Sequence, residues 1–122
     1  MYEVTIRESS KELTARERIR YKDVSYAQSL DKIVEPDSSF VVKPTAYAIL
    51  DVVNDKSDNG SYVKYIIEDA DGKLYSTGSE TFFTTFLNIF KEMANEGDYD
   101  LVIFKRQSQN YKGKYFLSCT IA

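Results

Sequence analysis

Residues 40–53 read FVVKPTAYAILDVV, a stretch rich in β-branched and aromatic residues. Such residues are enriched in strands, so the stretch predicts one long strand. Pro44 lies within it and has no backbone N–H to donate, so we expect an edge or a bulge at that point. The strand predicted over residues 40–53 is the first of a β-rich fold.

Four shorter strands are expected after this first one, and turn residues separate them. Asn59-Gly60 is a strong hairpin signal, Asp69-Ala70-Asp71-Gly72 is a second turn, and residues 108–113 form a third. The four strands are SYVKYIIE (61–68), KLYST (73–77), DLVIFKRQ (100–107) and KYFLSCTI (114–121).

One amphipathic helix is expected over residues 80–95, between the third and fourth strands. Ser79 can cap its start and Gly97 can stop it. The residues that repeat there at helical spacing are Phe82, Phe83, Phe86, Leu87, Ile89, Phe90 and Met93, and we assign the four phenylalanines to the core.

This order of three strands, one helix and two strands is that of an OB-fold, a five-stranded Greek-key β-barrel that binds oligonucleotides or sugars. We therefore expect a mainly β fold, an OB-like barrel with one inserted helix, over residues 40–122. Residues 1–39 are expected to be an α/β extension that packs on the barrel or extends it, within a single domain overall.

The extension has weaker patterns. Tyr2, Val4 and Ile6 alternate with polar residues and predict a short strand. Ser9 and Glu12 match a capping box and predict a helix over about residues 10–20, although the alternation of Arg16, Arg18, Arg20 and Lys22 would suit a strand as well. A short helical piece near residues 25–30 and a loop at 35–39 complete the extension.

The composition excludes several kinds of chemistry. The 122 residues include no His, so catalysis by imidazole and His-ligated metals are excluded. The single Cys119 excludes an intrachain disulfide and a Cys-cluster zinc site, and we expect it to be a buried apolar residue. The start MYEVTIRESS lacks the apolar core of a signal peptide, which predicts a cytoplasmic protein.

Aromatic and basic residues are the distinctive part of the sequence. It has 10 Tyr and 7 Phe, more rings than a small core can hide. Alternation along the strands predicts that Tyr65 and Tyr115 face inward. The side chains expected to face outward are Tyr47, Tyr62, Lys64, Lys73, Tyr75, Lys114 and Phe116, with Glu68 among them.

The charge is unevenly distributed. Residues 101–122 hold four bases and no acid, a local charge of +4 in a chain of net charge −3. Rings that stack on bases, with Lys and Arg along the phosphates, are what single-stranded nucleic acid binding requires. The predicted binding residues are Tyr47, Tyr62, Lys64, Lys73, Tyr75, Lys105, Arg106, Tyr111, Lys112, Lys114 and Phe116.

Short motifs resemble a known family. The segment Asp71-Gly72-Lys73-Leu74-Tyr75-Ser76, the helix after it and the segment Lys112-Gly113-Lys114-Tyr115-Phe116-Leu117-Ser118 resemble the single-stranded DNA-binding proteins of small tailed phages with protein-primed replication. The resemblance covers roughly residues 40–122. It implies an OB-like protein that coats and protects displaced single strands in the host cytoplasm.

The expected function is therefore non-catalytic binding of single-stranded DNA, with no cofactor, no metal and no membrane. Weak self-association and contacts with phage replication proteins are compatible with it. The acidic residues that might be offered as metal ligands, such as Asp69 with Asp71, lie in turns where Asp is expected for backbone reasons. The alternatives are a phage regulator that binds a host protein and, more weakly, a sugar-binding module.

Overall fold

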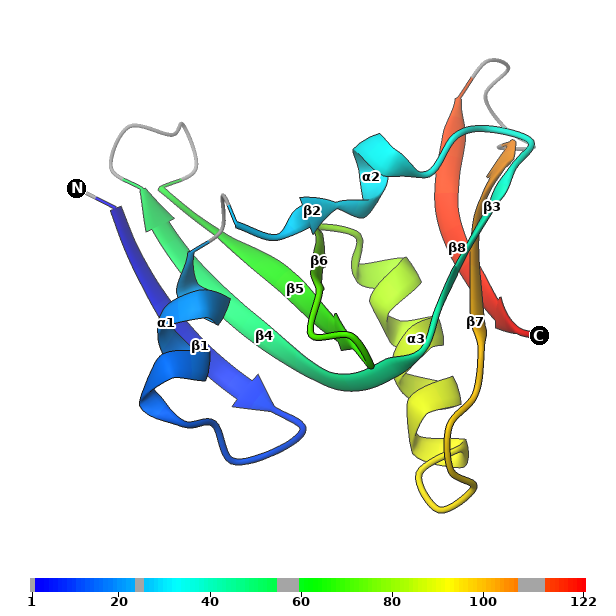
Figure 1. The fold of residues 1–122 in the computed structure, drawn as a ribbon. Coiled ribbons are helices and arrows are strands. Elements are labelled where there is room, and N and C mark those ends of the chain that lie inside the picture. The colour runs from blue at the N-terminus through cyan, green and yellow to red at the C-terminus, as the bar shows by residue number, and fades with distance from the viewer. Residues whose placement is uncertain (1, 24–25, 55–59, 108–113) are drawn as a thin grey trace. The chain divides into compact units, whose positions relative to one another are not determined.

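The structure is a computed structural model that describes residues 2–23, 26–54, 60–107 and 114–122 (Figure 1). The chain divides into two compact units, each built from separate parts of the sequence: residues 1–29 with 45–78, and residues 30–44 with 79–122. The residues expected to form an extension, 1–39, are thus shared between the two units.

The first unit contains a five-stranded sheet and one helix. Its strand order is β1-β4-β5-β6-β2, and most neighbours are antiparallel, whereas β2 runs parallel to β6. Its elements are β1 (Tyr2–Ser9), α1 (Ala15–Lys22), β2 (Gln28–Ser29), β4 (Pro44–Asn54), β5 (Ser61–Asp69) and β6 (Leu74–Thr77).

The second unit contains a three-stranded antiparallel sheet of order β3-β7-β8 and two helices. Its elements are α2 (Leu30–Ile33), β3 (Ser39–Val42), α3 (Glu80–Glu92), β7 (Leu101–Gln107) and β8 (Tyr115–Ile121).

Strand residues outnumber helical residues, so the expected mainly β class is confirmed. The expected closed barrel is not confirmed, because the described strands form two sheets and neither closes on itself. The physical reason lies at Pro44, where the predicted long strand is divided. Residues before it form β3 and pair with β7, whereas residues after it form β4 and pair with β1.

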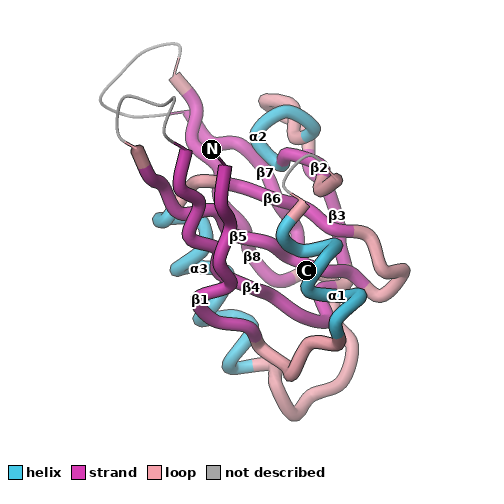
Figure 2. The backbone as a smooth tube through the Cα atoms, turned by 90° about the vertical axis from the view of Figure 1, so that its left-hand side faces the viewer, coloured by secondary structure: helices cyan, strands magenta, loops and turns pink. Residues whose placement is uncertain are grey.

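Helix α1 lies on one face of the five-stranded sheet (Figures 1 and 2). Its Tyr21 is fully buried in a core cluster with Leu50 and Val52 of β4 and Ile66 of β5. Burying a large side chain of this kind contributes about 1.5–3 kcal/mol. This packing orders α1 although the helix carries few other apolar residues.

The start of α1 differs from the expectation. The capping box uses Thr14, whose hydroxyl accepts from the backbone N–H of Glu17 at 3.2 Å, while the Glu17 carboxylate accepts from the N–H of Thr14 at 3.0 Å. Ser9 instead ends β1, and its hydroxyl donates to the carbonyl of Lys11. The helix expected at residues 10–20 therefore begins five residues later.

Other boundaries differ by a few residues. The short helical piece near 25–30 is strand β2 followed by helix α2. Helix α3 begins as predicted, with the Ser79 hydroxyl accepting from the N–H of Phe82 at 3.2 Å, but it ends at Glu92, before Gly97. The predicted core residues Phe82, Phe83 and Phe86 are buried, as is Cys119, which confirms those assignments.

A buried charged cluster holds α1 on the sheet. The carboxylate of Glu68 in β5 accepts from the Tyr21 hydroxyl at 2.6 Å and from the Arg20 guanidinium at 3.1 Å, and Lys11 lies 3.5 Å away. Glu68 was expected to face solvent, but it is only 7% exposed because α1 covers that face. Burial, with the bond to Glu68, raises the pKa of Tyr21 above its usual range.

Replacing Tyr21 with Phe tests this cluster. The Tyr21→Phe variant removes one hydrogen bond to a buried carboxylate, which should cost about 1.5–3 kcal/mol of unfolding free energy. Urea denaturation followed by circular dichroism measures it. Tyr115→Phe, at a ring 43% exposed, is the control and should stay within about 0.5 kcal/mol of wild type. Equal stability of the two variants would contradict the assigned role of the Glu68 cluster.

The capping box predicts a pH dependence. The hydrogen bond from Lys11, and the one from the Thr14 backbone, lower the pKa of Glu17 from 4.5 to about 2. A lowered pKa stabilises the fold above the unfolded value and loses that effect as pH falls from 4.5 toward 2. Urea midpoints at neutral and acidic pH should therefore differ less in Glu17→Gln than in wild type; an unchanged difference would contradict this.

Candidate nucleic-acid interface

The three-stranded sheet has one buried face and one exposed face. In β7, Leu101 and Ile103 are fully buried, so Phe104 and Arg106 lie on the opposite face. The register places Arg106 directly opposite Phe116 of β8. Alternation and pairing together therefore collect aromatic and basic side chains on the outer face.

We call Phe104, Arg106 and Phe116 the β7–β8 platform. The guanidinium carbon of Arg106 lies 5.3 Å from the centre of the Phe104 ring, within the range of a cation–π contact. Phe116 is 43% exposed, and Arg106 is exposed beside it. The platform thus presents two rings and a cation side by side on two neighbouring strands.

The surroundings of the platform are basic. Strands β3, β7 and β8 contain no acidic residue, and Lys114 precedes β8 in an exposed position. The acid just before β7, Asp100, accepts a hydrogen bond from Lys43 at 2.7 Å. That bond, with the attraction of the two charges, raises the pKa of Lys43. Nothing in these three strands opposes a phosphate near Arg106.

Lys105, which was expected to bind nucleic acid, contacts the protein backbone instead. Its ammonium donates to the backbone carbonyl of Asp31 at 2.7 Å, which ties β7 to helix α2. Lys105 therefore has a structural partner on the side away from the platform. Its neighbour Arg106 is the basic residue of β7 that reaches the outer face.

Two rings expected to face solvent are buried, and this corrects the sequence interpretation. Tyr75 is 4% exposed and its hydroxyl donates to Asp69 at 3.1 Å; Tyr47 is 8% exposed and its hydroxyl donates to Glu8 at 3.2 Å. The reason is that both faces of the sheet are buried near β6, since Ile66 and Ile67 point to opposite faces and both are inaccessible. Burial, with the bond to Asp69, raises the pKa of Tyr75 to about 12.

The remaining predicted residues lie in three places. Tyr62 is 42% exposed, Lys64 is half-buried and Lys73 is exposed, and all three belong to the first unit, whereas the platform belongs to the second. Tyr111 and Lys112 fall outside the described residues. The predicted residues that the structure describes are therefore divided between the two units.

Two rings outside the buried core were missed by the sequence interpretation, half-buried Phe104 and exposed Tyr26. Phe104 could have been found, because it alternates with buried Ile103 and precedes Arg106 by two residues. Tyr26 is 55% exposed and had no signal, since it follows a stretch without regular period. Tyr115, expected inside, is 43% exposed near the end of its sheet.

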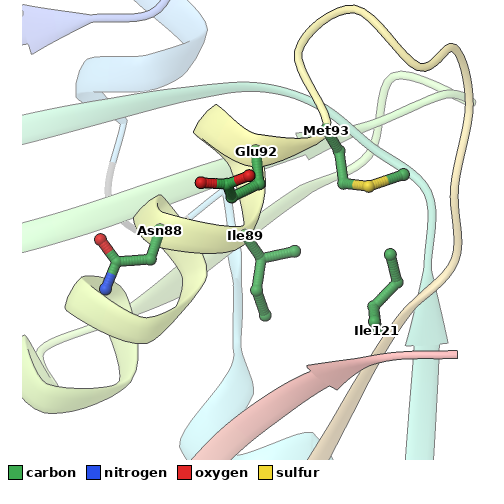
Figure 3. A pocket seen from close by; sticks show the side chains of 5 residues that line it. All are labelled: Asn88, Ile89, Glu92, Met93 and Ile121. Atoms are coloured by element: carbon green, nitrogen blue, oxygen red, sulfur yellow. The ribbon is translucent and has the colours of Figure 1, made fainter.

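An apolar hollow of about 240 Å³ lies on the second unit, between helix α3 and the end of β8. Figure 3 shows Ile89 and Met93 near Ile121, whereas the Glu92 carboxylate points away from Ile121. Its lining contains an acid and no base, so it does not suit a phosphate chain.

Within the described ranges, no three His, Cys, Asp or Glu residues are grouped so that they could hold a metal ion. No helix in the described part of the chain has the length and apolarity needed to cross a membrane. Comparison with protein families, curated proteins and solved structures finds no match to this chain.

Because Tyr75 is buried, we expect its replacement to destabilise the fold. Tyr75→Ala should lower the unfolding free energy by about 3–5 kcal/mol, because it empties a buried ring site. Phe116→Ala, at an exposed ring, should cost less than about 1 kcal/mol. Urea denaturation of the two variants measures the contrast. A larger loss at Phe116 than at Tyr75 would show that the two faces are assigned the wrong way round.

Proposed function

We propose that this chain is a non-catalytic protein that binds single-stranded DNA, with the β7–β8 platform as a stacking and phosphate-binding surface. The observation that carries the proposal is the group of Arg106 and Phe116, both exposed, with half-buried Phe104, on adjacent strands. Rings of this kind stack on bases of any identity, and a neighbouring cation attracts the phosphates.

Energetics support this use of the platform. Stacking of a base on an aromatic side chain contributes about 1–3 kcal/mol. Arg106 already lies over the Phe104 ring, so less of its side-chain freedom is lost when a phosphate approaches. The absence of acids from β3, β7 and β8 lowers the electrostatic cost of bringing a polyanion to this face, although the whole chain has a net charge of −3.

DNA, rather than RNA, is proposed because of the resemblance to phage single-stranded DNA-binding proteins in residues 71–76 and 112–118. The order β4, β5, β6, α3, β7 and β8 is also that of OB-like proteins, which supports the same class. On this proposal the protein coats displaced strands during phage replication in the host cytoplasm.

A titration with fluorescein-labelled oligo-dT, followed by anisotropy, tests the proposal. Wild type should bind at low salt. Phe116→Ala should weaken binding roughly 5- to 150-fold, the equivalent of about 1–3 kcal/mol. Tyr115→Ala is the matched control, because Tyr115 is equally exposed (43%) but lies on the other face of β8. No binding by wild type would overturn the proposal, and equal losses in both variants would remove the platform from it.

Salt adds a second readout. The logarithm of the affinity should fall with the logarithm of salt concentration by about 0.7 for each phosphate neutralised, so Arg106→Gln should lower that slope by about 0.7.

The second candidate function is a regulator that binds a host protein through exposed apolar side chains, which Val41 (54% exposed) and Phe116 favour. Oligo-dT binding that is absent, or independent of salt, would favour that candidate.

A further inference from the structure

A second hollow lies on the first unit, where β2 pairs with β6. The pairing is parallel and places Gln28 beside Tyr75 and Ser29 beside Ser76. The hollow has a volume of about 240 Å³ and is lined by Tyr26, Gln28, Lys73 and Leu74. We call it the β2–β6 hollow. All its lining residues belong to the first unit, whereas those of the platform belong to the second.

Each lining residue brings a different group. Tyr26 offers an aromatic ring that is 55% exposed. Leu74 lines the hollow with an apolar side chain that belongs to the core and is only 2% exposed. Gln28 and Lys73 are exposed and add an amide and an ammonium group. An amide both donates and accepts hydrogen bonds, whereas an ammonium only donates.

The backbone around the hollow is held in place before any ligand arrives. One oxygen of the Asp69 carboxylate accepts from the N–H groups of Asp71 and Lys73 at 3.0 and 2.8 Å, and the other accepts from the Tyr75 hydroxyl. Gly72 completes the turn with a φ of 81°, which favours glycine. The Asp69 carboxylate therefore holds the backbone from which the Lys73 side chain extends.

We propose that the β2–β6 hollow binds one nucleobase of a single strand, with the Tyr26 ring stacked on the base, Leu74 in apolar contact with it, Gln28 bonded to its polar edge and Lys73 at the adjoining phosphate. This inference rests on the proposed function and adds a second contact on the other unit. The ligand is a nucleobase because a ring, an amide and a cation meet there. The apolar hollow beside α3 has an amide, that of Asn88, but neither a ring nor a cation.

The first experiment uses the full chain and fluorescein-labelled oligo-dT. Tyr26→Ala should weaken binding at least about fivefold through loss of one stacking contact. Lys73→Gln should lower the salt slope by about 0.7. Ile19→Ala is the control, because Ile19 is 70% exposed in the same unit but does not line the hollow. Both substituted side chains in the hollow are exposed, and thermal unfolding by circular dichroism verifies that each variant is folded.

The second experiment separates this inference from the proposed function. Thymidine monophosphate is titrated into the ¹⁵N-labelled chain, and the NMR signals of the Gln28 side-chain amide and the Lys73 backbone amide are followed. Shifts there support the hollow even if wild type fails to bind oligo-dT, an outcome that overturns only the proposed function. If Phe116→Ala weakens oligo-dT binding, Tyr26→Ala does not and these amides do not shift, the hollow is overturned and the platform stands. If wild type binds no oligo-dT and no amide shifts, both are overturned.

Discussion

The buried carboxylate of Glu68 is the interaction on which the first unit depends. A lone charge in this position would be costly, and the structure offsets that cost with the Tyr21 hydroxyl at 2.6 Å, the Arg20 guanidinium at 3.1 Å and Lys11 at 3.5 Å. Tyr21 and Arg20 both belong to α1. The same contacts therefore satisfy the charge and hold the helix over the sheet, which closes the core around Leu50.

Pro44 marks the point at which one stretch of chain passes from the three-stranded sheet to the five-stranded sheet. One continuous stretch supplies β3 to the three-stranded sheet and β4 to the five-stranded sheet, so both sheets depend on a single segment of chain. Ion pairs use several of the acids near these strands, including Asp51 with Arg7 and Asp100 with Lys43. The two bases of β7 face no acid within their own sheet, and β8 holds no charged residue, which is how a chain of net charge −3 can present a basic face.

Local patterns predicted some elements well and left others undecided. Helix α3 was predictable because Ser79 and the regular phenylalanines act within one segment. Helix α1 was not, because the capping pattern occurs twice, at Ser9 with Glu12 and at Thr14 with Glu17. Both are equally good locally. In the structure the helix starts after Thr14, and its Tyr21 ring lies in the core with the hydroxyl bonded to Glu68.

The sequence alone determined where most of the described strands lie, because alternation, proline and glycine act over a few neighbouring residues. It also determined that residues 101–122 hold four bases and no acid. Only the tertiary structure decided which rings are exposed. Alternation divides each strand into two faces but does not say what covers them, so Tyr75 and Phe116 look alike in sequence. One lies in a sheet that is buried on both faces around it, and the other on the open face of a three-stranded sheet.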